Sequence, residues 1–440
     1  MTHEDLEVKV LGESTFNSPL IPTFYPDGLS FQFVENDDRV LFDATLEQFL
    51  NCQEAGVTPI SFEQAGPHKQ LYFDPSKTKA AIVTCGGLCP GLNDVIRSLV
   101  NELHYRYKVK KVIGIQYGYE GLISRYNHPF INLTTERVDT IHLFGGSILG
   151  SSRGNQDVGE MVDKIVEQDV DMLFCIGGDG TLRGAHAIHE EIQRRNLKIS
   201  IAGIPKTIDN DINLIDKSFG FETAFSIAND ILRYSHNEAK GAYNGIAILK
   251  LMGRNSGFIA AYAALSQQEA NFVLVPEMDF DFYGPKGLLA ALRKRLDERH
   301  HALIVVAEGA GQNFFTDESK DMDASGNIKN KDIGLYLKEK ITEQFRAENY
   351  PFSLKYIDPS YIIRSAPANA NDSKFCGLLA HNAVHAAMAG KTDFVVGHWN
   401  HTFTILPIPM AVLQQKKIKL ESELWWNVLE TTGQPALMKN

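Results

Sequence analysis

The sequence lacks any uninterrupted hydrophobic run near 18 residues, the length at which a segment becomes a candidate for crossing a membrane. Although 44% of its 440 residues are hydrophobic, charged and polar side chains interrupt every long apolar stretch. We therefore expect a chain that does not enter a membrane. The segment Met1–Glu7 is polar and acidic and lacks the hydrophobic centre of a secretion signal, so we expect a cytoplasmic location.

Cysteine and positive charge are also in short supply. The five cysteines are scattered and form no C-x-x-C pair, which is typical of reduced thiols in a cytosol. Cys85 and Cys89 flank a glycine loop, but no further Cys/His cluster lies near them in the sequence, so we expect no zinc site there. The 43 basic and 54 acidic residues give a net charge of −11, which argues against a general nucleic-acid-binding surface.

What the sequence does have is length and a regular alternation of two patterns. A chain of 440 residues suits two domains plus an extension. Residues 1–75 contain short mixed segments and no glycine loop, so we interpret them as an extension that packs on the main body. From Lys77 onward, short apolar segments alternate with helical patterns, which indicates parallel sheets covered by helices. The expected strands are Ala80–Thr84, Val112–Ile115, Met172–Ile176, Ile199–Ile204, Gly245–Leu249, Phe272–Val275 and Ala302–Ala307.

The most informative segment is Gly177–Thr181, which reads G-G-D-G-T and joins an apolar strand to an amphipathic helix. Glycines at such a junction let backbone N–H groups approach an anion at a helix N-terminus. The single carboxylate, Asp179, could hold a divalent cation against that anion. The segment therefore predicts a phosphate and metal site. An ordinary tight turn is the competing interpretation for one such loop taken alone.

Two similar junctions weigh against the ordinary turn. The strand Ala80–Thr84 is followed by the glycine loop Gly86–Gly91 and by a helical pattern from about Asn93. The strand Gly245–Leu249 leads into Leu251–Gly257, which reads L-M-G-R-N-S-G, and then into another helical pattern. Open parallel sheets bind ligands at the carboxyl ends of their strands, so we expect these loops to form ligand sites.

The segment Gly203–Asp211, G-I-P-K-T-I-D-N-D, follows another apolar strand. It should leave the sheet at the same edge as Asp179. Its carboxylates could accept a hydroxyl proton, and Lys206 could neutralise phosphoryl charge. A solvated Asp/Asn turn is the competing interpretation, and the position directly after an apolar strand weighs against it.

Taken together, these motifs resemble those of the 6-phosphofructokinases. The resemblance spans roughly residues 78–410 and is closest to the long-chain ATP-dependent branch that is related to the pyrophosphate-dependent enzymes. It is carried, in order, by T-C-G-G-L-C-P-G-L-N at Thr84–Asn93, G-Y-E-G-L at Gly118–Leu122, L-G-S-S-R-G at Leu149–Gly154, G-G-D-G-T, P-K-T-I-D-N-D-I, G-F-E-T-A at Gly220–Ala224, and M-G-R-N-S-G.

The resemblance implies an α/β fold with two related three-layer α/β/α, Rossmann-like domains and the N-terminal extension. The implied nucleotide-phosphate (donor) domain covers residues 76–222 with 364–413. The implied sugar-phosphate (acceptor) domain covers 223–363 with 414–440. A homodimer or homotetramer and allosteric control are also implied, but no effector can be read from the sequence.

On the donor side, the resemblance implies that ATP is bound through its phosphates and that Asp179 holds Mg²⁺. The residues that match the family's ATP-binding positions are Gly86, Arg153, Gly154, Gly178, Asp179, Gly180 and Thr181.

On the acceptor side, the resemblance implies that Asp209 is the general base and takes the proton from the 1-hydroxyl of fructose 6-phosphate, beside Lys206 as the second catalytic residue. The other residues that match substrate-binding positions are Thr207, Ile208, Met252, Gly253, Arg254, Glu308, Lys355, Tyr361, Ile362, Ile363 and Arg364. Shorter relatives have Arg and His where this chain has Lys355 and Tyr361. A lysine loses the bidentate fork of arginine, so surface positions for Lys355 and Arg364 remain the alternative interpretation.

Two positions bear on the donor, and they point in opposite directions. Pyrophosphate users resemble G-G-D-D, where the second Asp would repel the α-phosphate of ATP, whereas this chain has Gly180. Lys206 is the residue found in pyrophosphate users. We favour ATP, because a missing side chain removes a block while a lysine can assist either donor. The alternatives are a pyrophosphate-dependent phosphofructokinase, a lipid or NAD kinase that shares only G-G-D-G-T, and a catalytically silent nucleotide-sensing subunit.

Overall fold

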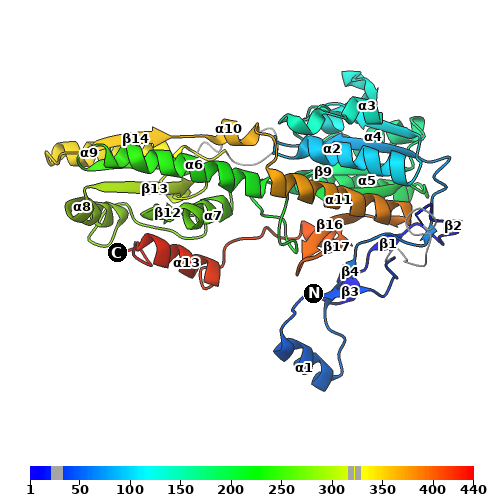
Figure 1. The fold of residues 1–440 in the computed structure, drawn as a ribbon, viewed down its shortest axis with the longest axis horizontal. Coiled ribbons are helices and arrows are strands. Elements are labelled where there is room, and N and C mark those ends of the chain that lie inside the picture. Colours follow the sequence, from blue (N-terminus) through cyan, green and yellow to red (C-terminus); the bar gives the residue numbers. More distant parts are fainter. Residues whose placement is uncertain (21–32, 316–321, 323–328) are drawn as a thin grey trace. The chain divides into compact units, whose positions relative to one another are not determined.

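The computed structural model describes residues 1–20, 33–315, 322 and 329–440. The chain divides into two compact units and passes from one to the other several times (Figure 1). Unit 1 contains Met1–Thr207, Ile212–Gly220 and Ser365–Gln414. Unit 2 contains Ile208–Asp211, Phe221–Arg364 and Gln415–Asn440. In the described parts of the chain, no helix combines the length and apolar character needed to span a membrane.

Unit 1 is built on a nine-stranded sheet with the order β3-β4-β17-β16-β10-β9-β6-β7-β8. The central strands from β16 to β7 are parallel, and the strands outside them pair antiparallel. The strands are β3 (Arg39–Leu41), β4 (Ser61–Gln64), β6 (Lys79–Thr84), β7 (Lys111–Ile115), β8 (Phe130–Asn132), β9 (Met172–Gly177), β10 (Ser200–Pro205), β16 (Phe394–Trp399) and β17 (Thr402–Pro407).

Helices cover both faces of the central strands, which explains why β9 and β10 are buried at every position and consist almost entirely of apolar residues. On one face, α4 (Val158–Glu167) and α5 (Asp179–Arg194) share a hydrophobic core with alternate strand residues such as Leu173 and Ile201. On the other face, α2 (Leu92–Asn101) and α11 (Ala370–Met388) lie side by side (Figure 1). The shorter helical elements of unit 1 are η1 (Glu4–Leu6), η2 (Glu102–Arg106), η3 (Gly118–Leu122), η4 (Ser124–Tyr126), α3 (Thr135–Val138), η5 (Ile141–Leu143) and α12 (Ile408–Ala411).

Unit 2 has a smaller sheet of four parallel strands in the order β12-β13-β11-β14. The strands are β11 (Gly245–Leu251), β12 (Phe272–Leu274), β13 (His301–Ala307) and β14 (Ser353–Ile357). Its core joins strand residues such as Ile248 and Ile304 to Leu292 and Leu337 of the covering helices. The helices are α6 (Phe221–Lys240), α7 (Phe258–Gln267), α8 (Leu288–Arg299), η6 (Gln312–Phe314), α9 (Ile333–Ala347), α10 (Ser360–Arg364) and α13 (Glu423–Thr432).

All of the strands expected from the apolar segments are present, with ends that differ by a residue or two. The α/β fold with parallel, helix-covered sheets is therefore confirmed. The hairpin of β16 and β17 was not predicted from the sequence. In the structure, Asn400 and His401 form its turn and have positive φ values of 46° and 64°. Such φ values are those of the hairpin turns that match the twist of a sheet.

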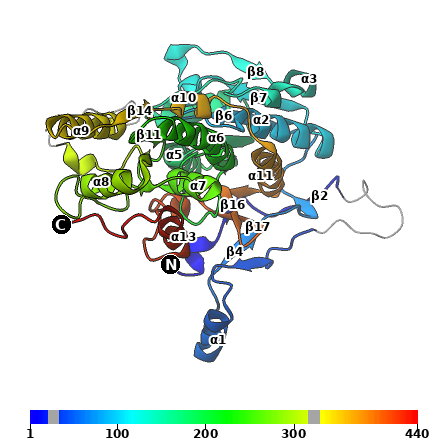
Figure 2. The ribbon, with the colours of Figure 1, turned by 60° about the vertical axis from the view of Figure 1, so that its left-hand side comes forward.

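The N-terminal residues do more than pack on unit 1. Strands β3 and β4 extend its sheet, β1 (Lys9–Val10) pairs with β15 (Lys391–Thr392), and β2 (Phe16–Asn17) pairs with β5 (Gln70–Leu71). In contrast, α1 (Leu46–Ala55) projects from the rest of the unit, and none of its residues is buried by the described parts of the chain (Figure 2).

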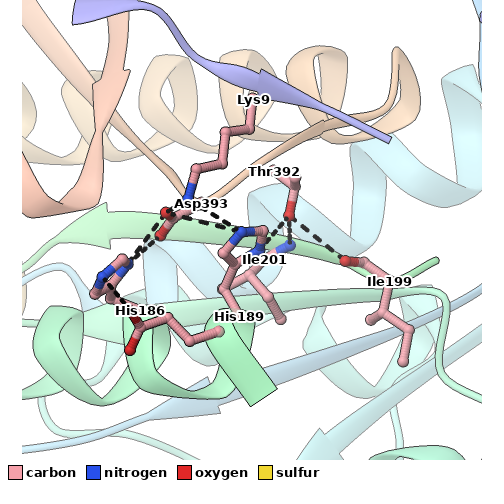
Figure 3. A network of polar contacts seen from close by, with 8 residues as sticks. Lys9, His186, His189, Ile199, Ile201, Thr392 and Asp393 are labelled. Carbon is pink, nitrogen blue, oxygen red and sulfur yellow. Dashed lines mark hydrogen bonds and ion pairs between the residues drawn. The ribbon is translucent and has the colours of Figure 1, made fainter. Parts of the chain in front are cut away.

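A polar network holds β1 in place (Figure 3). The Lys9 Nζ lies 2.9 Å from Oδ2 of Asp393, whose side chain is 1% exposed. His186 Nδ1 lies 2.9 Å from the other oxygen of this carboxylate, and the buried His189 lies on its far side with Thr392. A buried carboxylate is costly unless it is paired, so the N-terminal strand supplies part of what makes Asp393 tolerable.

Candidate functional site

In unit 1, three loops leave neighbouring strands at one edge of the sheet. Strands β6, β9 and β10 are adjacent, so their carboxyl ends lie side by side. The loops are also joined by backbone hydrogen bonds: Cys85 N donates to Ile176 O at 3.0 Å, and Lys206 N donates to Gly177 O at 2.9 Å. We call these loops, together with residues 149–154, the unit 1 edge.

Lys206 reaches across the unit 1 edge to the first glycine loop. Its Nζ donates to Gly87 O at 2.5 Å, and its side chain is buried. Gly86 has a φ of 86°, and a Cβ there would lie 3.2 Å from Lys206 Nζ. A Cβ on Gly87 would lie 3.0 Å from Nη2 of Arg153, which is next to Gly154. The structure therefore brings four of the residues predicted to bind donor phosphates, or to act beside them, close to one another.

Residues 149–154 are held against the same loop. Gly86 N donates to Ser152 O at 2.9 Å, and Ser151 Oγ donates to Gly86 O at 2.5 Å. Thr84 Oγ1 donates to Gly150 O at 2.6 Å. The two serines were part of the L-G-S-S-R-G motif, but the sequence analysis gave them no function.

The third part of the unit 1 edge is the N-terminus of α5. Gly178 is the N-cap residue of α5. Because glycine has no side chain, the N-cap accepts no side-chain hydrogen bond from the N–H groups of the first helical turn. The Thr181 side chain is buried against Gly177, where a Cβ would lie 2.1 Å from Thr181 Oγ1. Gly180 is exposed, and apart from its two chain neighbours and the backbone of its own helix, no described atom lies within 4 Å of the position that a Cβ would take. A free helix N-terminus with an open position beside it suits an anion.

Asp179, the predicted metal ligand, forms an ion pair that the sequence analysis missed. Arg183 Nε lies 2.9 Å from Asp179 Oδ2, and the guanidinium also donates to the carbonyl of Val412. The i, i+4 spacing on α5 was the signal for this pair. Asp179 must leave Arg183, at least in part, if it is to bind a cation.

No three His, Cys, Asp or Glu side chains among the described residues form a group that could hold a metal ion. Mg²⁺ is commonly bound through one or two carboxylates and the phosphates of a substrate, without a dedicated protein cage. The single carboxylate Asp179 beside an anion-binding helix N-terminus fits this type of site.

In unit 2, three of the predicted acceptor residues, Arg254, Glu308 and Arg364, lie near Asp209. The chain passes from unit 1 to unit 2 between Thr207, whose carbonyl accepts a 2.6 Å hydrogen bond from Ser218 Oγ, and the buried Ile208. Asp209 is then held by its own carbonyl, which accepts a 3.0 Å hydrogen bond from Ser256 Oγ.

The electrostatic environment of Asp209 is unusual. Removal from water and the nearby carboxylates of Asp211 and Glu308 raise its pKa to about 7. Arg364 and the backbone N–H of Arg254 act in the opposite direction and favour the charged form. The structure therefore brings Asp209, Arg254, Glu308 and Arg364 together, although they are spread over more than 150 residues of the chain.

Two of the predicted sugar-side segments are joined by backbone hydrogen bonds. Glu308 N donates to Leu251 O at 2.9 Å, and Gly309 N donates to Gly253 O at 3.0 Å. Gly253 has a φ of 125°, and a Cβ there would lie 2.4 Å from Ser256 O, so this turn requires glycine. Met252 is fully buried, so its side chain belongs to the core of the unit.

The third predicted segment does not present all of its side chains in the same way. On α10, Tyr361 is 82% exposed and Ile362 is 69% exposed, whereas Ile363 is fully buried. The Ile363 side chain is therefore a core anchor for the helix. Lys355 is exposed on β14, and its Nζ lies 3.6 Å from Glu238, so its charge already has a partner.

The chain is similar in sequence to several known proteins. Residues 79–387 match the family model described as phosphofructokinase. A protein from Borreliella burgdorferi named ATP-dependent 6-phosphofructokinase is 50% identical over 100% of this chain and 99% of its own length. A protein of the same name from Amycolatopsis methanolica is 45% identical over 98% of this chain and 95% of its own length. ATP-dependent 6-phosphofructokinase 7 from Arabidopsis thaliana is 45% identical over 92% of this chain and 82% of its own length.

Solved structures with a similar fold are more distant in sequence. A pyrophosphate-dependent phosphofructokinase from Marinobacter aquaeolei superposes with a TM-score of 0.67 at 20% identity, over 81% of this chain and 91% of that chain. Phosphofructokinase from Pichia pastoris gives a TM-score of 0.64 at 20% identity, over 81% of this chain and 39% of that chain. At this identity the likeness concerns the fold alone. From the family match and the near full-length relatives, the chain belongs to the phosphofructokinase family.

Proposed function

We propose that the protein is an ATP-dependent 6-phosphofructokinase, which transfers the γ-phosphoryl group of Mg-ATP to the 1-hydroxyl of D-fructose 6-phosphate. The products are fructose 1,6-bisphosphate and ADP, as in glycolysis. The observation that carries the proposal is the environment of Asp209. The pKa of this carboxyl group is raised to about 7, and Arg254, Glu308 and Arg364 lie near it. A general base works best when its pKa lies near the working pH, and the arginines supply the charge that a sugar phosphate needs.

In this mechanism, the unit 1 edge binds the donor. Backbone N–H groups at the start of α5 and the charges of Lys206 and Arg153 hold the phosphates of ATP and offset the negative charge that develops during transfer. Lys206 is already turned toward this loop by its bond to Gly87. Asp179 would hold a Mg²⁺ ion at this edge, and the ion would supply positive charge against the phosphates of the nucleotide.

The unit 2 residues bind the sugar and remove its proton. The Asp209 carboxylate takes the proton of the 1-hydroxyl as the oxygen attacks the γ-phosphorus, and the bond from that phosphorus to the β-γ bridging oxygen breaks. Glu308 accepts hydrogen bonds from sugar hydroxyls. Arg254 and Arg364 hold the sugar phosphate and its neighbouring groups, and Arg364 also limits the rise of the Asp209 pKa.

ATP is proposed as the donor on two grounds. Gly180 leaves an open position at the helix N-terminus, where a nucleotide's α-phosphate meets no side chain. The relatives that cover nearly the whole chain are named ATP-dependent enzymes. The buried Lys206 is the one feature that favours pyrophosphate instead.

A donor panel tests the proposal. The purified protein should convert fructose 6-phosphate with Mg-ATP at a kcat/KM at least about tenfold above that with Mg-pyrophosphate. Higher efficiency with pyrophosphate would replace the donor, and no turnover of fructose 6-phosphate with either donor would contradict the proposed function.

The wider organisation follows from the same proposal. Residues 76–222 with 364–413 form the donor domain, and residues 223–363 with 414–440 form the acceptor domain. Within these bounds, Ile208–Asp211 and Arg364 belong to the compact unit 2 and act on the acceptor side. The enzyme acts in the cytoplasm as a homodimer or homotetramer under allosteric control. Sedimentation velocity at several protein concentrations tests the oligomeric part, and a concentration-independent monomer would contradict it.

A further inference from the structure

Lys250 lies at the centre of the sugar-side segments of unit 2. It is the penultimate residue of β11, which lies between β13 and β14 in the sheet. The chain after β11 carries Met252–Arg254, the chain after β13 carries Glu308, and the chain after β14 carries α10. The Lys250 side chain is 12% exposed, and neither the sequence motifs nor the proposed mechanism uses it.

The ammonium group of Lys250 forms ion pairs with two aspartates, one at the start of α9 and one at the start of α10. Lys250 Nζ lies 2.7 Å from Asp332 Oδ2 and 2.9 Å from Asp358 Oδ2. Asp332 caps α9, where its Oδ1 accepts a 3.0 Å hydrogen bond from Leu335 N. Asp358 opens α10, where its Oδ1 accepts hydrogen bonds from Ser360 N at 3.1 Å and Ser360 Oγ at 2.5 Å.

The ammonium group of Lys250 offsets part of the negative charge of the two carboxylates in this cluster. The two carboxylates are each 31% exposed, and the Tyr356 hydroxyl donates to Asp332 at 2.9 Å. Burial alone would lower the pKa of Lys250, but its hydrogen bonds to Asp332, Asp358 and Tyr356 outweigh burial and raise the pKa. Without the ammonium group, two half-buried carboxylates would repel each other across the start of α10.

The cluster is also connected to the Glu308 segment. Gln312 Nε2 donates to Glu308 O at 2.9 Å and to Lys331 O at 3.1 Å, and Lys331 N donates back to Gln312 Oε1 at 3.1 Å. Lys331 directly precedes Asp332. The cluster thus joins the segments that carry Glu308 and Arg364, and both of these residues act on Asp209.

We propose that Lys250 is a positioning residue for the sugar phosphate: by holding Asp358, it fixes α10 so that Arg364 faces the acceptor. A five-residue helix has little stability of its own, so its direction depends on such an anchor. The inference rests on the proposed function for the identity of the ligand. It adds a residue that acts through another residue and does not itself touch the sugar.

Steady-state kinetics of Lys250→Met and Lys250→Arg test the proposal in the full chain. Lys250→Met should raise KM for fructose 6-phosphate about tenfold or more, with kcat and KM for ATP changed less than about twofold. Lys250→Arg keeps the charge and should restore most of the affinity. Lys340→Met is the matched control, because it removes a solvent-facing pair with Glu343 in the same unit and should leave all of these values unchanged.

A double-mutant cycle distinguishes positioning from general damage. If Lys250 acts through Arg364, then Lys250→Met should change KM for fructose 6-phosphate less than about twofold in an Arg364→Met background. Losses that multiply in the double variant, or a KM for the sugar that equals the parent's in Lys250→Met, would overturn the inference. A parent that turns over no fructose 6-phosphate would instead contradict the proposed function.

A second variant serves if Lys250→Met does not fold. Asp358→Asn keeps the shape and the bonds to Ser360 but removes the charge that Lys250 holds. It should raise KM for fructose 6-phosphate about threefold or more without changing KM for ATP. An unchanged KM in this folded variant would also count against the inference.

Discussion

The loops at the edge of the unit 1 sheet and those at the edge of the unit 2 sheet differ in the groups that they offer to a charged ligand. At the unit 1 edge, the shape is set by glycines and backbone, with Gly86 and Gly154 at φ values of 86° and 99° and the helix N-terminus of α5 open. We call the loops after β11, β13 and β14, together with Ile208–Asp211, the unit 2 edge. There, side chains dominate: Asp209, Asp211 and Glu308 lie near one another, and Arg364 supplies the opposite charge.

This difference matches what each edge is proposed to bind. A polyphosphate carries several charges of one sign, which backbone N–H groups and a helix dipole can stabilise without a matching set of side chains. A sugar presents hydroxyls, one of which must lose a proton, and this requires a carboxylate whose pKa is adjusted by its neighbours. Substitutions at each edge test this division.

Asp209→Asn should reduce kcat by about 10²–10⁴-fold, because the amide keeps the shape of the side chain but cannot accept the proton. Binding of fructose 6-phosphate, measured by calorimetry, should change little. Asp279→Asn is the control, since Asp279 is an exposed carboxylate of unit 2 that lies 3.5 Å from Lys439. A kcat within a few-fold of the parent would show that Asp209 is not the base.

Asp179→Ala should lower kcat on the order of 10–10²-fold and weaken the dependence of the rate on Mg²⁺. Arg183→Met separates the two roles of this carboxylate, because it removes the ion pair with Asp179 and keeps the metal ligand. It should therefore lower the Mg²⁺ concentration needed for half-maximal rate. Magnesium titrations of both variants provide the measurement, and a titration unchanged by Asp179→Ala would contradict the assignment.

Gly180→Asp should raise KM for ATP by about tenfold or more, because its carboxylate would face the α-phosphate. The open space around Gly180 means that the protein itself can accommodate the side chain. Pyrophosphate should be affected less. Gly180→Asn has nearly the same volume without the charge and should have a smaller effect; an ATP affinity equal to the parent's in Gly180→Asp would remove the reason for preferring ATP.

The pH dependence of kcat/KM for fructose 6-phosphate should show a group that must be deprotonated, with a pKa of about 7, because Asp209 must be ionised to act. The rate should therefore rise with pH through 7 and fall by up to about tenfold per pH unit below it. The phosphate ester of the substrate titrates near about pH 6, so the fit should use data above that pH. An acid limb confined to pH values below 5 would contradict the environment described for Asp209.

A change remote from both edges should affect stability and leave kinetics alone. Lys9→Met removes the ammonium that pairs with the buried Asp393 and should lower the free energy of unfolding by about 1–2 kcal/mol. Thermal unfolding measures this, with Lys77→Met, in an exposed pair with Asp74, as the control. If Lys9→Met had the same Tm as Lys77→Met, then His186 and His189 alone would be enough to stabilise the Asp393 carboxylate.

The parts of this structure that could be predicted from the sequence are those set by short-range patterns. Apolar strands followed by glycine loops or, at Lys206, by a polar segment predicted that Gly86, Asp179 and Lys206 lie at one edge, because parallel strands end on the same side of a sheet. The exposed and buried halves of α10 could not be separated, since five residues are too few to show a helical period.

Long-range pairing was also out of reach. Strand β1 is two residues long, and its partner β15 lies some 380 residues away, so no local pattern marks either strand. The raised pKa of Asp209 likewise depends on Glu308 and Arg364, which only the folded sheet brings near. The proposed role of Asp209 was implied by the resemblance to the family, whereas its raised pKa could be seen only in the structure.

The distribution of thiols gives this molecule a practical property. Cys85, Cys89, Cys175 and Cys376 are buried, and burial raises the pKa values of Cys85, Cys175 and Cys376. Cys52 is the partly exposed member of the five, and it lies on α1, the helix that projects from unit 1. A maleimide fluorophore should therefore attach at this one position in the unmodified chain, where its anisotropy would report the motion of α1 without any engineered cysteine.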